Sequence, residues 1–442
     1  MHLLLKRRIV VLLLLSSCLF AGCGPGAQTA NRPDSSSLDV VLMLTMLGLV
    51  ALDRQDGKQR WTFRPPGWQS PQESGTGPLI IVDGVVYWKA DHLYAIRAED
   101  GKQLWSTALD ARGPSILISV ASDLVYTTIF STVYAFDKQN GRLVWKKETN
   151  ISDAAGSVQL LLTVSGTTLY VWGQQALLAL DAETGATRWE YRHGNACGQI
   201  TIVMPHNDII LVQVGGIGTQ AANDILGLQA SDGQQHWQMA VPNTALLRSG
   251  QDRFYTIAAE NSTGKTSPVP TTIGAYSFNN GQRQWTIQDQ VASSEFADET
   301  FYQVRGTALG EIVARSGADG HLLWSVQSDH AYTSLTIDNG TIYALTQKGE
   351  VVALSARDGT QRWIYASGDA QVALSVQAHL PYLRGFVVGQ EKGGKLAGTL
   401  MALDPDGKGP LWQAAIGDEA FGPFGTSSLE AVITVFETGP CP

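Results

Sequence analysis

Cysteine is scarce in this chain: only four occur in 442 residues, at positions 18, 23, 197 and 441. Cys18 and Cys23 fall in an N-terminal leader, so only Cys197 and Cys441 remain for the body of the protein. In an oxidising compartment these two have a single way to pair, and the bond would join the C-terminal tail to the middle of the domain. Pairing also requires a close approach of their Cα atoms, which sequence spacing does not set.

Positive charge is in the minority, with 31 Lys and Arg against 40 Asp and Glu and a formal net charge of −9. Removal of the leader takes away Lys6, Arg7 and Arg8 and no acid, which leaves a charge of about −12. Such a surface repels phosphate backbones, so we expect no nucleic acid partner. Charged residues still make up 16% of the chain, which is too many for a protein with several membrane spans.

Long hydrophobic runs are also missing, apart from one at the N-terminus. There the basic MHLLLKRR precedes the apolar IVVLLLLSSCLFA, and Gly22-Cys23 follows. This order resembles a bacterial lipoprotein signal peptide, which predicts a leader over residues 1–22 and lipid attachment at Cys23. Cys18, after LSS, is a second candidate junction, and an uncleaved anchor helix is the alternative to cleavage. Each alternative places the body of the protein outside the cytoplasmic membrane.

The polar stretch GPGAQTANRPDSSS follows, so we expect residues 23–37 to be a lipidated cysteine with a flexible tether. The next apolar stretch, residues 40–52, has 13 residues, whereas a membrane-spanning helix needs about 20. We therefore expect a buried hairpin there, at the start of a folded domain over residues 38–442. No stretch of the chain shows a sustained helical period.

A repeated phrase fills most of the chain. ALDAETGATRW, residues 179–189, has similar copies from residues 51, 95, 135, 227, 275, 314, 353 and 402. In all nine, a small residue stands ten positions before a tryptophan and a glycine stands four or five before it. The tryptophans are Trp61, Trp105, Trp145, Trp189, Trp237, Trp285, Trp324, Trp363 and Trp412. The glycines are Gly57, Gly101, Gly141, Gly185, Gly233, Gly281, Gly320, Gly359 and Gly407. Successive tryptophans are 39 to 49 residues apart, a period typical of propeller blades.

Each part of the phrase has a physical role. Asp-Gly, Asn-Gly or Thr-Gly predicts a hairpin turn, because glycine adopts positive φ without steric cost. Alternating residues before the turn, as in LYAIRA, predict a strand, and the tryptophan starts the returning strand. Two further β-rich runs precede most copies, so each unit should form about four antiparallel strands. Radial stacking would bury both faces of each sheet, with the tryptophans as core residues in the seams between blades.

Eight full units lie between Trp61 and Trp412. The first phrase has too little sequence before it for a whole blade, whereas SLEAVITVFE, residues 428–437, is a strand without a phrase. We therefore predict an all-β propeller of eight complete four-stranded blades plus a split blade. In the split blade, residues 428–437 would pair with the hairpin at 38–66 and close the ring. If that hairpin lies outside the ring, the ring has eight blades.

The phrase resembles the repeat of PQQ-like β-propellers, a superfamily that includes quinoprotein alcohol dehydrogenases and the factor B lipoproteins of outer-membrane protein assembly. The resemblance covers roughly residues 40–440 and implies the propeller fold, but a fold alone does not imply a function. The family is usually eight-bladed, so the split ninth blade is a departure. Factor B lipoproteins are similar in length, lipid signal and tether. They bind the barrel subunit of the assembly machine through inter-blade loops, but EYRHGNACGQ, after Trp189, lacks the expected hydrophobic-plus-Arg contact motif.

Quinoprotein chemistry does not carry over with this resemblance. Those enzymes hold the quinone with a vicinal disulfide and a calcium ion, and this chain has neither an adjacent cysteine pair nor Cys-x-x-Cys-His. Its eight histidines lack metal-ligand spacing, and GQEKGGKL, from Gly389, lacks the Ser or Thr of a phosphate-binding loop. We expect no cofactor, no metal and no catalytic residue, and so no enzyme. A PQQ-dependent dehydrogenase and a propeller that binds small ligands or carbohydrates are the alternatives.

Three stretches lengthen the repeat: residues 214–224, 260–272 and 379–398. Extra loops on a rigid ring are where such folds place binding, although neutral surface elaboration is the alternative. We expect a monomeric scaffold of the cell envelope that is held at the membrane by its N-terminal lipid. Its partners would be envelope proteins bound through these loops.

Overall fold

The computed structural model describes residues 40–45, 48–68, 79–109, 117–151, 160–173, 175–194, 198–216, 223–241, 245–259, 270–305, 310–377, 379–385, 387–388, 391–392 and 398–415. Every regular element in these ranges is a β-strand. This part of the chain accordingly contains no helix that is able to cross a bilayer.

Antiparallel sheets of consecutive strands make up the first half of the chain. Blade 1 has three strands: β1 (Val40–Thr45), β2 (Gly48–Asp53) and β3 (Gln59–Phe63). Blade 2 has β4 (Leu79–Val82), β5 (Val85–Lys89), β6 (His92–Arg97) and β7 (Gln103–Ala108). Blade 3 has β8 (Ile118–Ala121), β9 (Leu124–Ile129), β10 (Thr132–Asp137) and β11 (Leu143–Glu148). Blade 4 has β12 (Leu161–Ser165), β13 (Thr168–Trp172), β14 (Ala176–Asp181) and β15 (Thr187–Arg192).

The second half continues in the same way. Blade 5 has β16 (Gly198–His206), β17 (Ile209–Gly216), β18 (Asn223–Gln229) and β19 (Gln235–Val241). A seven-stranded sheet follows, with β20 (Ala245–Ser249), β21 (Arg253–Ala259), β22 (Pro270–Ser277), β23 (Arg283–Ala297), β24 (Thr300–Arg305), β25 (Glu311–Ser316) and β26 (Leu322–Gln327). Blade 8 has β27 (Tyr332–Asp338), β28 (Thr341–Thr346), β29 (Glu350–Ser355) and β30 (Gln361–Ala366). Blade 9 has β31 (Val372–Gln377), β32 (Leu380–Gly385), β35 (Thr399–Leu403) and β36 (Pro410–Ala415), and carries the hairpin β33 (Val387–Val388) and β34 (Glu391–Lys392).

The seven-stranded sheet is two blades that share a strand. β23 is 15 residues long; it pairs with β22 as far as Gln290 and with β24 from Val291 onward. It is therefore the outermost strand of blade 6 (β20–β23) and the innermost strand of blade 7 (β23–β26). The sequence predicted separate blades here, and the difference has a local cause: TIQDQVASSEFA, residues 286–297, has no glycine or proline to end the strand.

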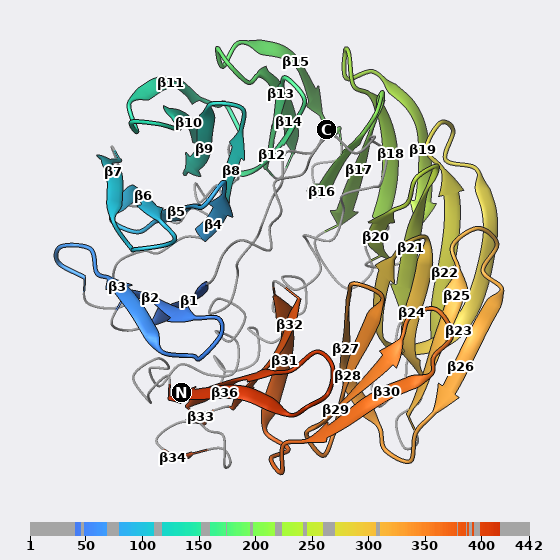
Figure 1. Ribbon diagram of the computed structural model, residues 1–442. Helices are drawn as coiled ribbons and strands as arrows, with labels where there is room; N and C mark the ends of the chain where they lie inside the picture. Colours follow the sequence, from blue (N-terminus) through green and yellow to red (C-terminus); the bar gives the residue numbers. More distant parts are fainter. Residues whose placement is uncertain are drawn as a thin grey trace, which may run out of the picture.

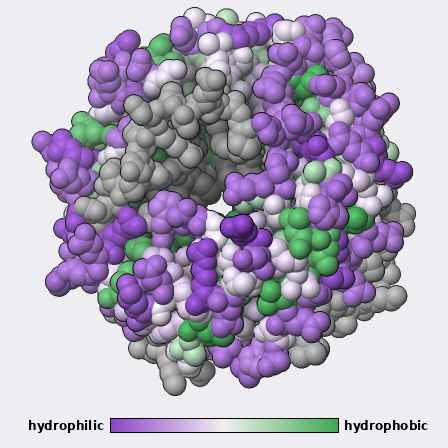
Figure 2. Space-filling model, turned by 45° about the vertical axis from the view of Figure 1, so that its right-hand side comes forward, coloured by the Kyte–Doolittle hydropathy of each residue, from purple (hydrophilic) through white to green (hydrophobic). Residues whose placement is uncertain are grey.

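The nine blades stand side by side around a ring, and blade 9 returns to blade 1 (Figure 1). Apolar side chains of neighbouring blades meet in separate clusters. One cluster joins Leu42 and Trp61 of blade 1 to Trp88 of blade 2, and another joins Val41 of blade 1 to Tyr382 of blade 9. The outside is mostly hydrophilic, with separate apolar spots on the surface that Figure 2 shows. The predicted all-β propeller is confirmed.

The predicted blade count is confirmed for the eight four-stranded blades. The first hairpin lies inside the ring as a three-stranded sheet, so the eight-bladed alternative is wrong. The segment that was predicted to complete this sheet, residues 428–437, lies outside the described residues.

The ring has two different faces because antiparallel strands alternate in direction. One face, which we call the turn face, carries two kinds of connection. These are the connections from the first to the second strand of a four-stranded blade and the phrase turns from the third to the fourth strand. Connections from second to third strand, and those between most successive blades, leave on the other, the loop face. The two faces therefore carry different kinds of connection.

Candidate functional site

The structure places each of the nine phrase tryptophans between its own blade and the next. Each indole Nε1 donates a hydrogen bond of 2.7–3.1 Å to a backbone carbonyl in the phrase turn of the following blade. The donor and acceptor pairs are Trp61–Ala98, Trp105–Lys138, Trp145–Ala182, Trp189–Ala230, Trp237–Phe278, Trp285–Gly317, Trp324–Ala356, Trp363–Pro405 and Trp412–Arg54. None of the nine side chains is exposed.

The small residue of each phrase lies directly across from its tryptophan. Ala51 pairs with Trp61 and Ala95 with Trp105, and all nine phrases repeat this register with a bulge at the next residue. In the fifth phrase even the methyl group of alanine does not fit, because a Cβ at Gly227 would lie 2.2 Å from the Trp237 ring. A small residue here leaves the indole free to lie across the strand.

The phrase glycines combine a turn with a close approach. All nine have φ between 65° and 83°, and a Cβ on any of them would lie 2.4–3.0 Å from the tryptophan ring of the preceding blade. Glycine is therefore required twice at each position, for the backbone and for the packing.

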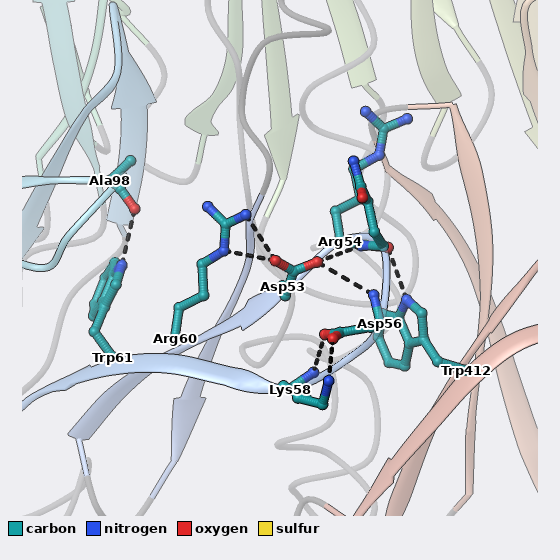
Figure 3. Close-up of polar contacts among 9 residues, drawn as sticks. Asp53, Arg54, Asp56, Lys58, Arg60, Trp61, Ala98 and Trp412 are labelled. Atoms are coloured by element: carbon teal, nitrogen blue, oxygen red, sulfur yellow. Dashed lines mark hydrogen bonds and ion pairs between the residues drawn. The ribbon is translucent and has the colours of Figure 1, made fainter.

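Blade 9 meets blade 1 through the same contact (Figure 3). Trp412 Nε1 donates to Arg54 O at 2.7 Å, across 358 positions of sequence. Beside it, the Asp53 carboxylate accepts from Arg60 Nε at 2.8 Å and from Gln55 N at 2.7 Å. Burial acts to raise the pKa of Asp53, but these hydrogen bonds outweigh it and leave the pKa below its ordinary value. The carboxylate stays charged and fixes the turn on which Trp412 rests.

Seven tyrosines, which the sequence did not single out, complete the seams. Each lies across from the small residue on the second strand and tilts over the tryptophan, with ring centroids 5.8–6.1 Å apart. They are Tyr87, Tyr126, Tyr170, Tyr255, Tyr302, Tyr343 and Tyr382. Burial raises the pKa of each phenol, that of Tyr126 to about 12. The phenols remain neutral, and Tyr126 Oη donates to Ala182 O, the carbonyl that Trp145 also uses.

The seam between blades 6 and 7 adds a charged cluster. The Asp289 side chain is 1% exposed and contacts Arg305 Nε at 2.6 Å and Arg315 Nη2 at 2.9 Å. Glu311 contacts the other side of Arg305 at 3.0 Å. No sequence motif marked these residues, because Asp289 stands in the middle of a shared strand that the repeat does not predict.

The three long stretches predicted to bind partners belong to connections between second and third strands. They join β17 to β18, β21 to β22 and β32 to β35, so the described ends of all three leave the ring on its loop face. The last stretch also contains all of β32 and the hairpin β33–β34. Residues 217–222, 260–269, 386, 389–390 and 393–397 lie outside the described part of the chain.

The remaining predicted positions are cysteines. Cys23, predicted to carry lipid, and the predicted pair Cys197 and Cys441 all lie outside the described residues. A polar groove of about 160 Å³ is present between β11 and β15, and its lining charges balance: Lys147 and Arg192 against Glu148 and Glu190.

We tested whether the residues fit a quinone cofactor with its calcium ion. The sequence has no adjacent cysteine pair. Within the described ranges, no three side chains of His, Cys, Asp or Glu lie together as metal ligands would. The described residues therefore do not supply the metal ligands of this group.

Comparison with known families decides the relationship. The family model described as outer membrane protein assembly factor BamB matches residues 46–199, 129–288 and 269–433. The chain belongs to this PQQ-repeat family. Each of the three matches covers four of the phrase tryptophans, so the family repeat and the blade repeat coincide.

Curated relatives of this PQQ-repeat protein share only part of their length with it. The tetrathionate hydrolase of Acidithiobacillus ferrooxidans is 26% identical over 242 residues, 50% of this chain and 46% of the hydrolase. The serine/threonine-protein kinase AfsK of Streptomyces coelicolor is 27% identical over 165 residues, 37% of this chain and 19% of the kinase. The chain thus spans less than half of either relative.

Among solved structures, BamB from Moraxella catarrhalis is similar at 18% identity and a TM-score of 0.44. The similarity covers 72% of this chain and 96% of that protein.

Proposed function

We propose that this PQQ-repeat protein is a non-catalytic, membrane-tethered scaffold of the cell envelope that binds protein partners through its inter-blade loops during envelope protein assembly. One observation carries the proposal: three long connections, from blades 5, 6 and 9, leave a closed ring on the same face. A rigid ring fixes the relative positions of such loops, so one partner surface meets several of them together.

Two further observations support a place in the envelope. The N-terminal residues resemble a lipoprotein leader with Cys23 at its junction. The matching family is described by its role in outer-membrane protein assembly. Both are consistent with an exported chain whose partners are envelope proteins.

Photo-cross-linking in living cells tests the proposal. A photoreactive amino acid is placed at Asp224 or at Lys392, beside two of the long loop-face connections. The matched controls carry it at Asn280 and Asn339, which are exposed in turns of the opposite face. We expect one discrete envelope protein to be captured from both loop-face positions and from neither control.

An assay of the purified protein separates this proposal from the dehydrogenase and ligand-binding alternatives. Given PQQ and calcium, the protein should fail to reduce a redox dye with alcohols or sugars. Dye reduction would instead support an exported dehydrogenase. Binding of a sugar or another small molecule, with no protein captured at Asp224 or Lys392, would support the ligand-binding alternative.

A further inference from the structure

Exposed apolar side chains gather on the outermost strands at two parts of the ring. Among the described residues, the first group is Leu104 on β7 with Leu143 and Val144 on β11, which are 38–42% exposed. The second group is Leu322, Leu323, Ile364 and Leu411 on β26, β30 and β36, which are 43–52% exposed. The outermost strands of blades 4 to 6 carry none of the large exposed apolar residues.

Charge distinguishes the two groups. Lys102 and Arg142 are exposed beside Leu104 and Leu143, and neither forms an ion pair with a described residue. Lys146 and Lys147 continue along β11. By contrast, β26 and β36 contain no charged residue, and β30 contains one, Arg362, whose Nη1 donates to Thr341 Oγ1. We call Lys102, Leu104, Arg142, Leu143, Val144 and Lys146 the basic rim.

The basic rim is continuous because β7 rests against the turn that leads into β11. Trp105 Nε1 donates to Lys138 O at 3.0 Å, and Thr107 Oγ1 donates to Gly141 O at 2.6 Å. β7 and β11 both begin at the turn face, so Leu104 and Val144 lie near the same face of the ring. Asp100, the acid nearest in sequence to Lys102, forms an ion pair with Arg97, with 2.9 Å between Arg97 Nη1 and Asp100 Oδ2.

The chain enters the ring beside this rim. Val40 pairs with Asp53 at the phrase turn, so β1 begins at the turn face, in the blade that contacts blade 2 through Trp61. Only 16 residues separate Cys23 from Val40. A flexible tether of that length has a root-mean-square span of about 20–25 Å, so a lipid on Cys23 would hold the turn-face side of blades 1 to 3 near the bilayer.

We propose that the basic rim rests on the surface of an anionic bilayer, with Leu104, Leu143 and Val144 at the headgroup level and Lys102 and Arg142 on the lipid phosphates. The inference rests on the membrane tether of the proposed function. Apolar and cationic side chains together favour an anionic lipid interface. The chain as a whole has a formal net charge of −9, so an anionic bilayer repels the protein in most orientations. The favoured orientation is the one in which the basic rim faces the bilayer. Lipid contact therefore sets the direction in which the loop face points.

The test uses the full lipidated chain in phosphatidylcholine vesicles with and without phosphatidylglycerol. A photo-cross-linking amino acid replaces Leu104 or Val144, and control chains carry it at Ile364 or Leu411, which are at least as exposed and belong to the second group. We expect lipid adducts at Leu104 and Val144, only in anionic vesicles and less at high salt. The double variant Lys102→Glu, Arg142→Glu should lower the adduct yield about tenfold, whereas Arg283→Glu with Lys408→Glu should not.

Flotation of the same samples separates the two proposals. A chain that floats with the vesicles but gives no lipid adduct at Leu104, or equal adducts at Ile364, overturns the basic rim and leaves the tether intact. A chain that does not float overturns the tether and the rim with it. Cross-links to protein rather than lipid at Leu104 and Val144 overturn the rim as a lipid contact. Should the charge variants fail to fold, the comparison of Leu104 with Ile364 in the unaltered background still decides.

Discussion

At the scale of single residues, each seam depends on a few groups whose roles are separable. The phrase glycines carry both a backbone and a packing requirement, whereas Gly84 carries only the first. Gly141 and Gly84 have nearly the same φ, 71° and 73°. A Cβ on Gly141 would lie 2.4 Å from the Trp105 ring, but a Cβ on Gly84 meets nothing within 4 Å.

Comparison of these glycines yields the first prediction. Gly84→Ala should cost about 1–2 kcal/mol in unfolding free energy from backbone strain alone. Gly141→Ala should cost about 1–3 kcal/mol more, because the Trp105 indole must shift in a packed seam. Urea unfolding of the two variants measures the difference. Equal losses would show that the seam tolerates the extra methyl group.

The second prediction concerns a shared carbonyl. Ala182 O accepts from Trp145 Nε1 and from Tyr126 Oη, each at 3.1 Å. Loss of the Tyr126 hydrogen bond in Tyr126→Phe should cost about 1 kcal/mol or less in unfolding free energy, because Trp145 Nε1 still donates to Ala182 O. The double variant with Trp145→Phe should lose about 1–2 kcal/mol beyond the sum of the single losses, because it leaves a buried acceptor without a donor. A double-mutant cycle in urea checks this, and strict additivity would contradict it.

The third prediction is a pH dependence. His206 stacks on Phe278 with ring centroids 3.7 Å apart, and burial lowers the pKa of the imidazole below its ordinary value of about 6.5. The neutral ring is therefore favoured in the folded state. The stability that the neutral His206 ring contributes is complete at pH values above the pKa of this imidazole in the unfolded chain. It is lost as the pH falls through the lower pKa of the folded state.

The urea midpoint of the native chain should accordingly fall between pH 7 and about pH 5 by more than that of His206→Gln. The substitution removes the titrating ring, so the two pH profiles should differ only over this range. Parallel profiles would mean that His206 titrates alike in the folded and unfolded chain.

At the scale of elements, the repeat predicted hairpins well and the shared strand not at all. Asp-Gly and Asn-Gly turns followed by tryptophan fix the third and fourth strands locally. The tyrosines of the second strand escaped notice because their distance from the small residue varies, from 8 residues for Tyr87 and Ala95 to 20 for Tyr255 and Ala275. Long connections between second and third strands interrupt the pattern, and contacts across them depend on the assembled sheet.

The fourth prediction concerns the shared strand β23. Asp289→Asn should cost about 3 kcal/mol, because Arg315 loses its carboxylate in a site where that carboxylate is 1% exposed and Arg305 keeps only Glu311. The control Asp181→Asn breaks a pair between Asp181 and Arg188, whose side chains are 31% and 35% exposed, and should cost much less because solvent screens the pair. Thermal unfolding of both variants decides, and similar losses would remove the special role of Asp289.

At the scale of the whole molecule, the number of phrases predicted the number of sheets, because each phrase supplies one turn and one seam. Sequence alone did not place the long loops on a common face. That placement follows from strand direction once the second and third strands are assigned. The charge pattern of the outermost strands likewise becomes visible only when neighbouring blades are set side by side.

The fifth prediction concerns closure. Trp412→Ala should weaken the seam between blades 9 and 1 at a cost of about 3–5 kcal/mol, as should Trp105→Ala between blades 2 and 3. The apolar cluster that joins Val41 to Tyr382 remains in the first variant. Only this variant weakens the seam between the first and last blades of the described chain, so hydrogen exchange should rise selectively in residues 40–63. Uniform exchange across all blades would indicate that blade 1 is held by other contacts.

Each of the nine phrase tryptophans donates its seam hydrogen bond forward, from its own blade to the next, and none of them donates to the preceding blade. These hydrogen bonds therefore run in one direction around the ring. Because the seam between blades 9 and 1 contains the same bond as every other seam, the bonds do not mark which blade comes first in the sequence. A circular permutant that begins at another blade should therefore fold to the same ring, and duplication or loss of one repeat would change only the number of blades.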